Sequence, residues 1–383
     1  MFCAYTYIKF TCIQRGLSTS ISAEEAKLFP FPRNIYIIMS MHLRRTLTAA
    51  FLALCAGVSL SKADSPGTTG ANFIKIPVAP IPTAMGGAYT ALYGPDSVLY
   101  NPAGLGLMNY SVLSVAHNSY MEGISQDYAA MALRTNMGTF GLTLNTLRSG
   151  DFKAYDNNGA GIGTTSSSHQ LWIFSWGQMW PHFDRDRGYL DKMLITPEWS
   201  RMKVPDEYRS GADKIAIGAS LKLVKERLDD ATASSTSGDV GLLYVPHKHT
   251  HLGLAVQNIF GSQKFDSEAY ALPRTIRAGI ARDWETKSKL IIMLLSVDAI
   301  KESDRSLYFA AGTEANIIQA IQLRFGYKSN ADLGNGISAG MGLSLDRLGE
   351  GALMLKGVRV DYAFVSQGMV GTTHRIGLQM LFF

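Results

Sequence analysis

Apolar and polar residues alternate along much of the chain, and this period of two predicts β-strands rather than helices. In 321–328 and 337–346, apolar residues hold every second position, and small, polar or charged residues lie between them. Segments of about ten residues with this alternation are typical of membrane β-barrels, although a soluble antiparallel barrel would show it too. The alternation predicts fourteen strands, at 110–118, 127–135, 138–148, 169–177, 213–225, 237–246, 251–258, 275–285, 289–299, 307–315, 320–328, 337–346, 352–364 and 373–383.

The links between the predicted strands mostly alternate between short and long, as expected of an outer-membrane barrel with turns at one end and loops at the other. Segment 178–212 departs from this rule as a long, charged insert within the barrel domain 110–383. Apolar residues in 259–272 are expected either to bind a hydrophobic ligand or to pack on one another. Tight links are predicted at Asn136-Met137, 286–288 and 316–319, and longer ones at 119–126, 149–168, 259–274 and 329–336.

The segment before the strands carries the pattern of an export signal. Arg44 and Arg45 precede an uncharged run over 46–60, and Ser61 and Ala63 place small residues before a cut at 64. This pattern predicts a cleaved signal peptide at 39–63, and the run is too short for a membrane-spanning helix. A buried apolar helix is the alternative, but no capping residue or helical period accompanies the run. Residues 1–38 are expected to be an upstream extension.

Charge and cysteine content change meaning once this leader is set aside. Lys and Arg total 36 against 31 Asp and Glu, which gives a formal net charge of +5, but seven of the basic and two of the acidic residues lie in 1–63. The remaining chain is neutral, so a nucleic-acid partner loses its support. All three cysteines, Cys3, Cys12 and Cys55, also lie in the leader. The exported chain therefore has no disulfide framework and no thiolate metal site, and we expect no metal and no cofactor.

A barrel of this size encloses a lumen that something must fill. Predicted inward positions such as Gly218 and Gly326 are too small to fill it. Residues 64–109 precede the first strand and are predicted to be a plug, in which 83–92 forms a short helix with Thr83 as its N-cap. We therefore expect an all-β fold, a transmembrane antiparallel β-barrel of about 14 strands with an N-terminal hatch or plug segment.

Two motifs in the predicted plug resemble a known family. The run over 85–91, followed by the run over 96–105, is similar to the N-terminal region of the PorV/PorQ family and of the related FadL long-chain fatty-acid transporters. The resemblance implies an outer-membrane barrel in which the Asn-Pro-Ala segment belongs to a hatch inside the lumen. It assigns the hatch or gate to Met85, Gly86, Gly87, Asn101, Pro102, Ala103 and Gly104.

The end of the chain resembles the signal that the outer-membrane assembly machinery reads in a last strand. Gly377, Met380, Phe382 and Phe383 carry this spacing. In a soluble protein so apolar a strand would be an exposed, sticky edge unless the sheet closes. The assembly machinery and outer-membrane lipid are therefore expected partners.

Other motifs have a plainer explanation than catalysis or metal binding. Segment 336–340 matches the G-x-S-x-G elbow around Ser338, but it lies inside an alternating strand, so no enzyme is predicted. His247, His249 and His251 could bind a metal, with a solvated turn as the alternative.

Three arginines are candidates to hold a ligand carboxylate inside the lumen. Arg277, Arg324 and Arg359 occupy predicted inward positions, where a guanidinium can bind a carboxylate through two hydrogen bonds. The same face also holds Asp283 and Asp361, so pairing within the lumen is the alternative.

These observations lead to a functional hypothesis that rests partly on the resemblance. The chain is expected to carry hydrophobic small molecules such as long-chain fatty acids across the outer membrane, through a lumen gated by the hatch. A PorV-like role, binding or shuttling exported proteins or surface glycolipids, is the alternative. An outer-membrane lipase acting through Ser338 is the third hypothesis.

Overall fold

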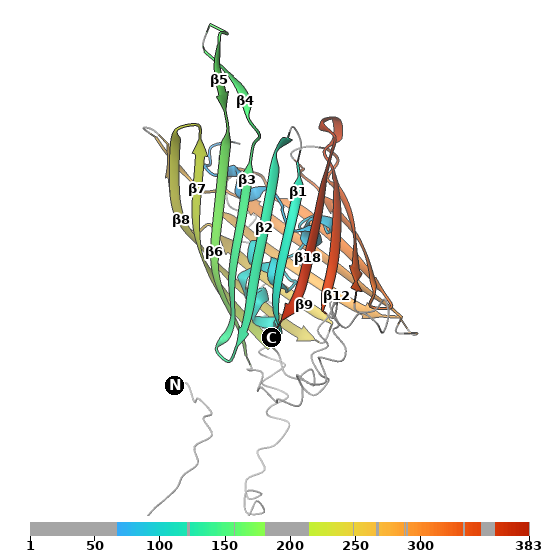
Figure 1. Cartoon of the computed structure of the whole chain (residues 1–383). Coiled ribbons are helices and arrows are strands. Elements are labelled where there is room, and N and C mark those ends of the chain that lie inside the picture. Colours follow the sequence, from blue (N-terminus) through green and yellow to red (C-terminus); the bar gives the residue numbers. More distant parts are fainter. Residues whose placement is uncertain are drawn as a thin grey trace, which may run out of the picture. The chain divides into compact units, whose positions relative to one another are not determined.

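The computed structural model describes residues 67–120, 123–156, 158–180, 214–247, 249–265, 268–286, 288, 290–331, 334–345 and 357–382. Within them, fourteen antiparallel strands close into one barrel in which the first strand pairs with the last (Figure 1), and the predicted fold class is confirmed. Over these ranges, no helix is both long and apolar enough to cross a membrane. The barrel strands are β1 (Ser111–Ser119), β2 (Ser125–Thr135), β3 (Gly138–Arg148), β6 (Ser167–Trp180), β7 (Lys214–Leu228), β8 (Ala231–His247), β9 (Thr250–Gln257), β12 (Thr275–Glu285), β13 (Ile291–Glu302), β14 (Tyr308–Ile317), β15 (Ile321–Lys328), β16 (Ile337–Ser344), β17 (Val358–Ser366) and β18 (Thr372–Phe382).

Each of the predicted strands is present, and the differences lie at strand ends and in the loops. β8 begins at Ala231 rather than at 237, because a stretch rich in Thr and Ser continues its ladder with β7 beyond the alternating region. The alternation also fails to predict two small hairpins, whose strands of three to five residues are too short to show a period. They pair β4 (Phe152–Tyr155) with β5 (Gly161–Thr165) and β10 (Ser262–Lys264) with β11 (Ala269–Ala271).

Most short and long links lie at opposite ends of the barrel, as predicted, although the two-residue β7–β8 turn lies at the end that carries the long loops. The turns β2–β3, β12–β13 and β14–β15 lie at one end, called here the turn end, and the loops β1–β2, β3–β6, β9–β12 and β15–β16 lie at the other, the loop end. The loop end is uppermost in Figure 1, where the β4–β5 hairpin stands clear of the barrel. Another link at this end contains η8 (Gly368–Val370). The leader 1–63 and all but the first three residues of the insert 178–212 lie outside the described residues.

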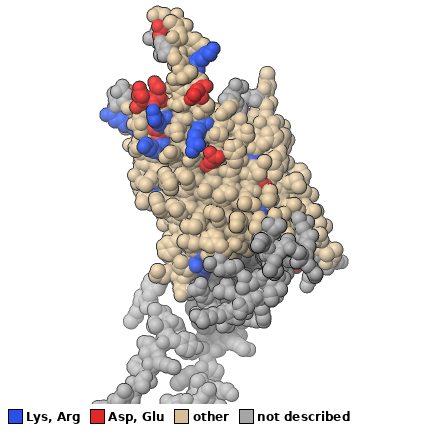
Figure 2. Space-filling model, in the orientation of Figure 1, with Lys and Arg blue, Asp and Glu red and all other residues tan. Residues whose placement is uncertain are grey.

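The wall reverses the arrangement of a soluble protein, because its apolar side chains point outward and its charged side chains point inward. On β15, Phe325 is 60% exposed, whereas its neighbour Arg324 is 0% exposed. On β6, Phe174 is exposed and Ser175 is buried. Figure 2 shows charged residues gathered near the loop end, with the rest of the visible described wall largely uncharged. This is the surface that a barrel wall presents to hydrocarbon.

The segment before β1 lies inside the barrel, where the first short helices appear within the ring of strands (Figure 1). Residues 70–109 are called the plug here. The α2 helix contacts β15, β16, β17 and β18, and η4 contacts β3, β6, β7 and β8, so the plug reaches across the lumen. Its elements are η2 (Asn72–Lys75), α2 (Pro80–Ala84), η3 (Pro95–Leu99) and η4 (Pro102–Leu107).

The helix of the plug is not the predicted one, and the prediction of a helix over 83–92 is wrong. The α2 helix ends at Ala84, because Gly86 and Gly87 follow with φ values of 66° and 81°, which no right-handed helix can hold. Pro80 occupies its first turn, where the missing N–H of proline does no harm. Thr83 therefore lies inside the helix instead of capping it, and its Oγ1 donates a hydrogen bond to the Ala79 carbonyl at 2.7 Å.

Inward glycines of the wall let the plug lie directly against the strand backbones. A Cβ on Gly218 would overlap the main chain of Pro102, and one on Gly326 would overlap the main chain at Gly86. The plug therefore packs against the small inward positions, through its backbone at some glycines and through its side chains at others. This set, called here the glycine track, consists of Gly141, Gly177, Gly218, Gly241, Gly253, Gly279, Gly312, Gly326, Gly340 and Gly377.

Gly218→Val should displace the plug and leave the barrel in place, because the new side chain overlaps Pro102 while the outer face of β7 is unchanged. Overpacking of this kind lowers the free energy of unfolding by about 1–3 kcal/mol. Limited proteolysis should then cut 80–107 roughly tenfold faster than in the wild type. Ala219→Val, on the exposed outer face of the same strand, is the matched control. Equal protection of the plug in both variants would rule out the glycine track as the seat of the plug.

Candidate functional site

Asn101 joins two parts of the plug to the wall. Its side-chain oxygen accepts a hydrogen bond from the Ala103 N–H at 3.0 Å, so it caps η4, and Pro102 takes the first helical position. Its Nδ2 donates to the Thr90 carbonyl at 2.8 Å and to the Leu242 carbonyl of β8 at 3.1 Å. Asn101 is fully buried. The predicted Asn-Pro-Ala segment therefore holds the two halves of the plug together at the wall.

The chain reverses at Gly86 and Gly87, directly after α2. Gly86 lies so close to β15 that a Cβ on it would be 2.7 Å from the Tyr327 nitrogen. Gly87 presents its carbonyl to the wall, where Arg277 Nη2 donates to it at 2.6 Å. A side chain at Gly86 would meet both a disfavoured backbone conformation and the wall, so this reversal requires glycine there.

Arg277 of β12 and Asp298 of β13 grip the middle of the plug. The Asp298 carboxylate accepts hydrogen bonds from the N–H groups of Tyr89 and Thr90, both at 3.0 Å, and from the Thr90 hydroxyl at 2.5 Å. Arg277 Nη2 lies 3.1 Å from Asp298, and its Nε donates to Thr90 Oγ1 at 2.9 Å. Arg277 and Asp298 with Gly87 and Thr90 are called the latch here. Removing one partner of such a buried pair is destabilising by about 3–5 kcal/mol.

Two tyrosines of the plug lie beside the latch. The Arg277 guanidinium sits 5.0 Å from the centre of the Tyr100 ring, and the rings of Tyr100 and Tyr89 are 5.7 Å apart. Burial raises the pKa of Tyr100 to about 12, so its phenol is neutral at physiological pH. The latch therefore fixes this aromatic pair as well as the main chain between Gly87 and Thr90.

The two other predicted arginines form a separate buried network within the wall. Arg324 donates to Glu314 and to Asp361, both at 2.7 Å. Arg359 donates from Nε to Asp361 at 2.8 Å and from Nη2 to Gln379 at 2.8 Å. The structure thus brings Arg324 and Arg359 together and holds both on wall side chains, while Arg277 lies in the latch. Their role toward a ligand carboxylate stays a prediction.

The Asp96 side chain holds η3 to three strands of the wall. Its carboxylate accepts hydrogen bonds from Ser114 at 3.1 Å and Tyr128 at 3.0 Å, and from Gln379 Nε2 at 3.1 Å. These partners lie on β1, β2 and β18, and none of them carries a charge. Burial raises the pKa of Asp96 to about 6, despite the hydrogen bonds that favour its charged form.

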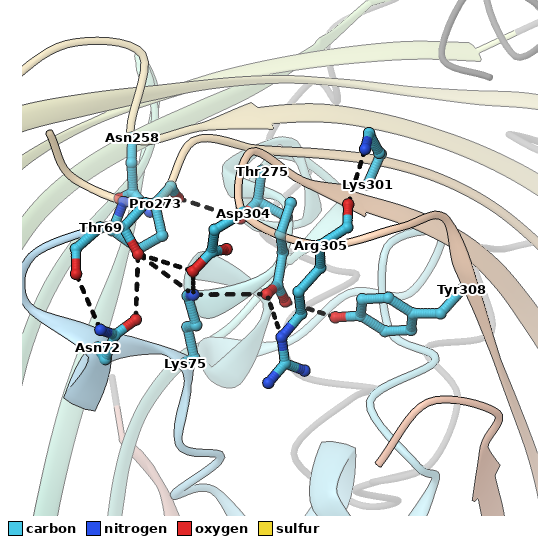
Figure 3. Close-up of polar contacts among 11 residues, drawn as sticks. Thr69, Asn72, Lys75, Asn258, Pro273, Thr275, Lys301, Asp304, Arg305 and Tyr308 are labelled. Carbon is cyan, nitrogen blue, oxygen red and sulfur yellow. Dashed lines mark hydrogen bonds and ion pairs between the residues drawn. The ribbon is translucent and has the colours of Figure 1, made fainter. Parts of the chain in front are cut away.

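A further attachment lies at the loop end, where η2 meets the β13–β14 link (Figure 3). Lys75 Nζ lies 2.6 Å from Asp304 and 3.7 Å from Glu302, and the Thr69 hydroxyl donates to Asp304 at 2.8 Å. Burial alone would raise the pKa of Asp304, but the hydrogen bonds from Lys75 and Thr69 hold it below its ordinary value. The plug is thus pinned to the wall at both the start and the middle of its path.

A cavity of about 100 Å³ lies on the loop side of the plug. Leu171 and Ile173 of β6 give it an apolar side, which the buried plug residues next to η2 continue. The acid that lines it, within the described ranges, is Glu302. Its cationic lining residues are Lys75, Lys222, Arg277 and Lys328. Such a cavity suits a molecule with an apolar body and an anionic end.

A second cavity, of about 60 Å³, lies on the turn side of the plug and is lined by residues such as Ile81 and Arg359. The partition between the two cavities is the plug itself. Gly87 and Tyr100 line the loop-side cavity, whereas Met85 and Tyr89 line the turn-side cavity. The predicted hatch residues at 85–87 therefore lie at this partition, although their gating role stays a prediction.

The other residues singled out in the sequence have structural contacts. Ser338 lies inside β16, and its hydroxyl donates to the Ala84 carbonyl of the plug at 3.2 Å. His249 lies 2.9 Å from Asp283 at the turn end. Among the described residues, no cluster of His, Cys, Asp and Glu could hold a metal ion.

The described part of the predicted assembly signal lies in β18. Gly377 points inward, where a Cβ would come 2.8 Å from the Pro80 ring, and Met380 is exposed on the outer face. Phe382 is the last residue of the strand, and Phe383 lies outside the described residues. Recognition by assembly machinery stays a prediction. Gly104, a predicted hatch residue, packs η4 against η3 at Ser97.

The wall partner of the latch and the polar anchors of the plug were not predicted from the sequence. Asp298 follows Ser296 at the next inward position of β13, and the register places it opposite Gly279, diagonal to Arg277. The alternation along β13, combined with the register between β12 and β13, would have identified Asp298 as the partner of Arg277. Thr90 lies in an irregular segment and Asp96 in the short helix η3, and neither segment has a periodicity that would mark these residues.

No family model matches the chain, and no curated protein matches it. The structure is similar to the toluene transporter TodX of P. putida, with a TM-score of 0.47 and 11% identity over 79% of this chain and 96% of that one. It is also similar to a Pseudomonas aeruginosa FadL homologue, with a TM-score of 0.41 and 8% identity over 80% of this chain and 98% of that one. For Acinetobacter baumannii Omp33 the TM-score is 0.37, with 8% identity over 72% of this chain and 100% of that one. At these scores the likenesses say nothing of what this barrel binds.

The raised pKa of Asp96 makes the stability of the folded chain depend on pH. Burial favours the neutral carboxyl of Asp96. The stabilisation of the folded chain by this neutral group is therefore complete below about pH 4, and it is lost as the pH rises through about 6. A shift of this size corresponds to about 3 kcal/mol. Asp96→Asn is neutral throughout and should flatten this part of the profile. Urea unfolding midpoints at about pH 4 and about pH 7.5 measure this pH dependence. A difference between wild type and variant that is the same at both pH values would refute the prediction.

Proposed function

We propose that this chain is an outer-membrane channel for hydrophobic molecules, with long-chain fatty acids as the substrate class, and that the plug is its hatch. The observation that carries the proposal is that a separate segment closes the lumen, with a cavity on either side of it. The plug lies between the two cavities, so its movement would join them. The resemblance of 85–91 and 96–105 to the hatch of FadL transporters agrees with this reading.

The wall supports a membrane location for this channel. Its exposed apolar belt would face lipid, and its polar side chains and the plug would fill the interior. The long loops would then face outward and the short turns would face the periplasm. The signal peptide and the last strand of the sequence are consistent with export and assembly there.

Capture of substrate would begin at the loop end. Ile259, Phe260, Phe265 and Tyr270 are each more than 40% exposed in the β9–β12 link, whereas Leu272 is buried. Exposed apolar residues close to an amphipathic cavity offer a first contact for the hydrocarbon chain of a fatty acid. The loop-side cavity would then take the anionic end of a fatty acid beside its cationic lining.

A disulfide between plug and wall tests the hatch. Val98 Cγ1 lies 3.6 Å from the place of a Cβ on Gly141, and the sequence has no cysteine after Cys55. In liposomes, the Val98→Cys/Gly141→Cys variant should take up labelled oleate when reduced and lose most of that uptake when oxidised, because the plug can no longer move.

The two single variants, oxidised in the same way, are the controls and should keep their uptake. Uptake by the oxidised double variant equal to that of the reduced form would refute the hatch. Wild-type uptake equal to that of empty liposomes would refute the transport function itself.

A second candidate function is the binding or shuttling of an exported protein or surface glycolipid. It is favoured by the β4–β5 hairpin, which stands clear of the barrel (Figure 1) and exposes Phe152 and Tyr155 by 46% and 60%. Retention of an exported partner by the wild type, and its loss on replacing both residues by serine, would support this function if oleate uptake is absent.

A further inference from the structure

We propose that Arg277 is a positioning residue that couples the loop-side cavity to the plug, so that an anionic headgroup in the cavity releases the latch and an uncharged one does not. The inference rests on the proposed function and deepens it, because it names the head chemistry that opens the channel. Its basis is that one guanidinium both holds the plug and lines the cavity.

The donors of Arg277 are divided between these two tasks. Its Nε and Nη2 are used by Thr90, Gly87 and Asp298. Within the described part of the chain, its Nη1 makes no hydrogen bond, and the side chain keeps 8% of its surface exposed and lines the cavity. A carboxylate that enters the cavity therefore meets a guanidinium edge with a donor still available.

Lys328 gives the cavity a cation that the wall does not balance. Lys75 is paired with Asp304 and Lys222 with Asp239, at 2.6 and 2.8 Å. Lys328 instead lies 4.9 Å from the centre of the Tyr308 ring, and no carboxylate among the described residues pairs with it. A partly buried charge without a partner favours binding of an anion from outside.

Binding of that anion would weaken the hold on the plug. A carboxylate prefers the two parallel hydrogen bonds that a guanidinium offers, and it would draw Arg277 away from the Gly87 carbonyl and the Thr90 hydroxyl. The Tyr100 ring would also lose the cation above it. These contacts lie at the partition between the cavities, so their loss frees the segment that separates them. A neutral chain of equal length has no charge with which to compete.

The test uses the full chain with Cys3, Cys12 and Cys55 replaced by serine, so that Val98→Cys supplies the one thiol. Val98 is 1% exposed, and labelling of this thiol by a maleimide in liposomes therefore reports release of the plug. Sodium oleate should speed labelling roughly tenfold, within the range usual for coupled sites. Oleyl alcohol, which has the same chain without the charge, should leave the rate unchanged.

Two variants separate this coupling from a purely structural role. Arg277→Met should label fast without ligand and should not respond to oleate. Asp298→Asn keeps an acceptor for the plug N–H groups but frees Arg277 from its anion, so it should bind oleate several-fold more tightly than the wild type. Lys301→Met is the matched control, because Lys301 is a similarly buried cation of β13 that donates to the Arg305 carbonyl and does not line the cavity, and it should keep the oleate response.

The outcomes distinguish the latch from the transport function. Equal acceleration by oleyl alcohol, or oleate binding to Asp298→Asn no tighter than to the wild type, would overturn the coupling. Oleate that enters liposomes without any change in labelling at position 98 would overturn the coupling and leave the transport function standing. Oleate that is neither bound nor carried by the wild type would overturn both.

Discussion

Close approach between plug and wall is the constraint on which the rest of this structure depends. The plug backbone rests on strand backbone at glycines such as Gly218 and Gly326, so little room remains for side chains between them. That fit places Asn101 within reach of β8 and the Thr90 segment within reach of β12 and β13. Both cavities are what is left on either side of the plug once it is seated.

Polar contacts then fix where along the glycine track the plug sits. Contact between backbones at glycines does little to define where the plug sits along the wall. A buried carboxylate such as Asp298, by contrast, accepts hydrogen bonds from particular N–H groups of the plug. Asp96 belongs to the plug, and its carboxylate accepts hydrogen bonds from side chains on three strands of the wall. Because an unpaired buried charge is unfavourable, each of these groups holds the plug to one register.

Periodicity predicted the wall well and the plug poorly, for a physical reason. In the wall, Arg324 and Phe325 face opposite environments, so the sequence must alternate there. In the plug every side is enclosed, and no period survives. Asn101 was predicted to matter through the family resemblance, and its capping of η4 involves only neighbouring residues. The partner of Arg277 could not be found locally, since Asp298 meets it only through the register of two strands.

The seam between β1 and β18 has a consequence for folding. Ser111 pairs with Phe382, so the barrel closes through contacts between the two ends of the strand-forming chain. Contacts so distant in sequence form slowly, because loop-closure entropy opposes them. The plug precedes β1 and packs on Gly377 of β18 through Pro80. Because β18 packs on the plug as well as on β1, the plug offers a surface on which the last strand can complete the ring of strands.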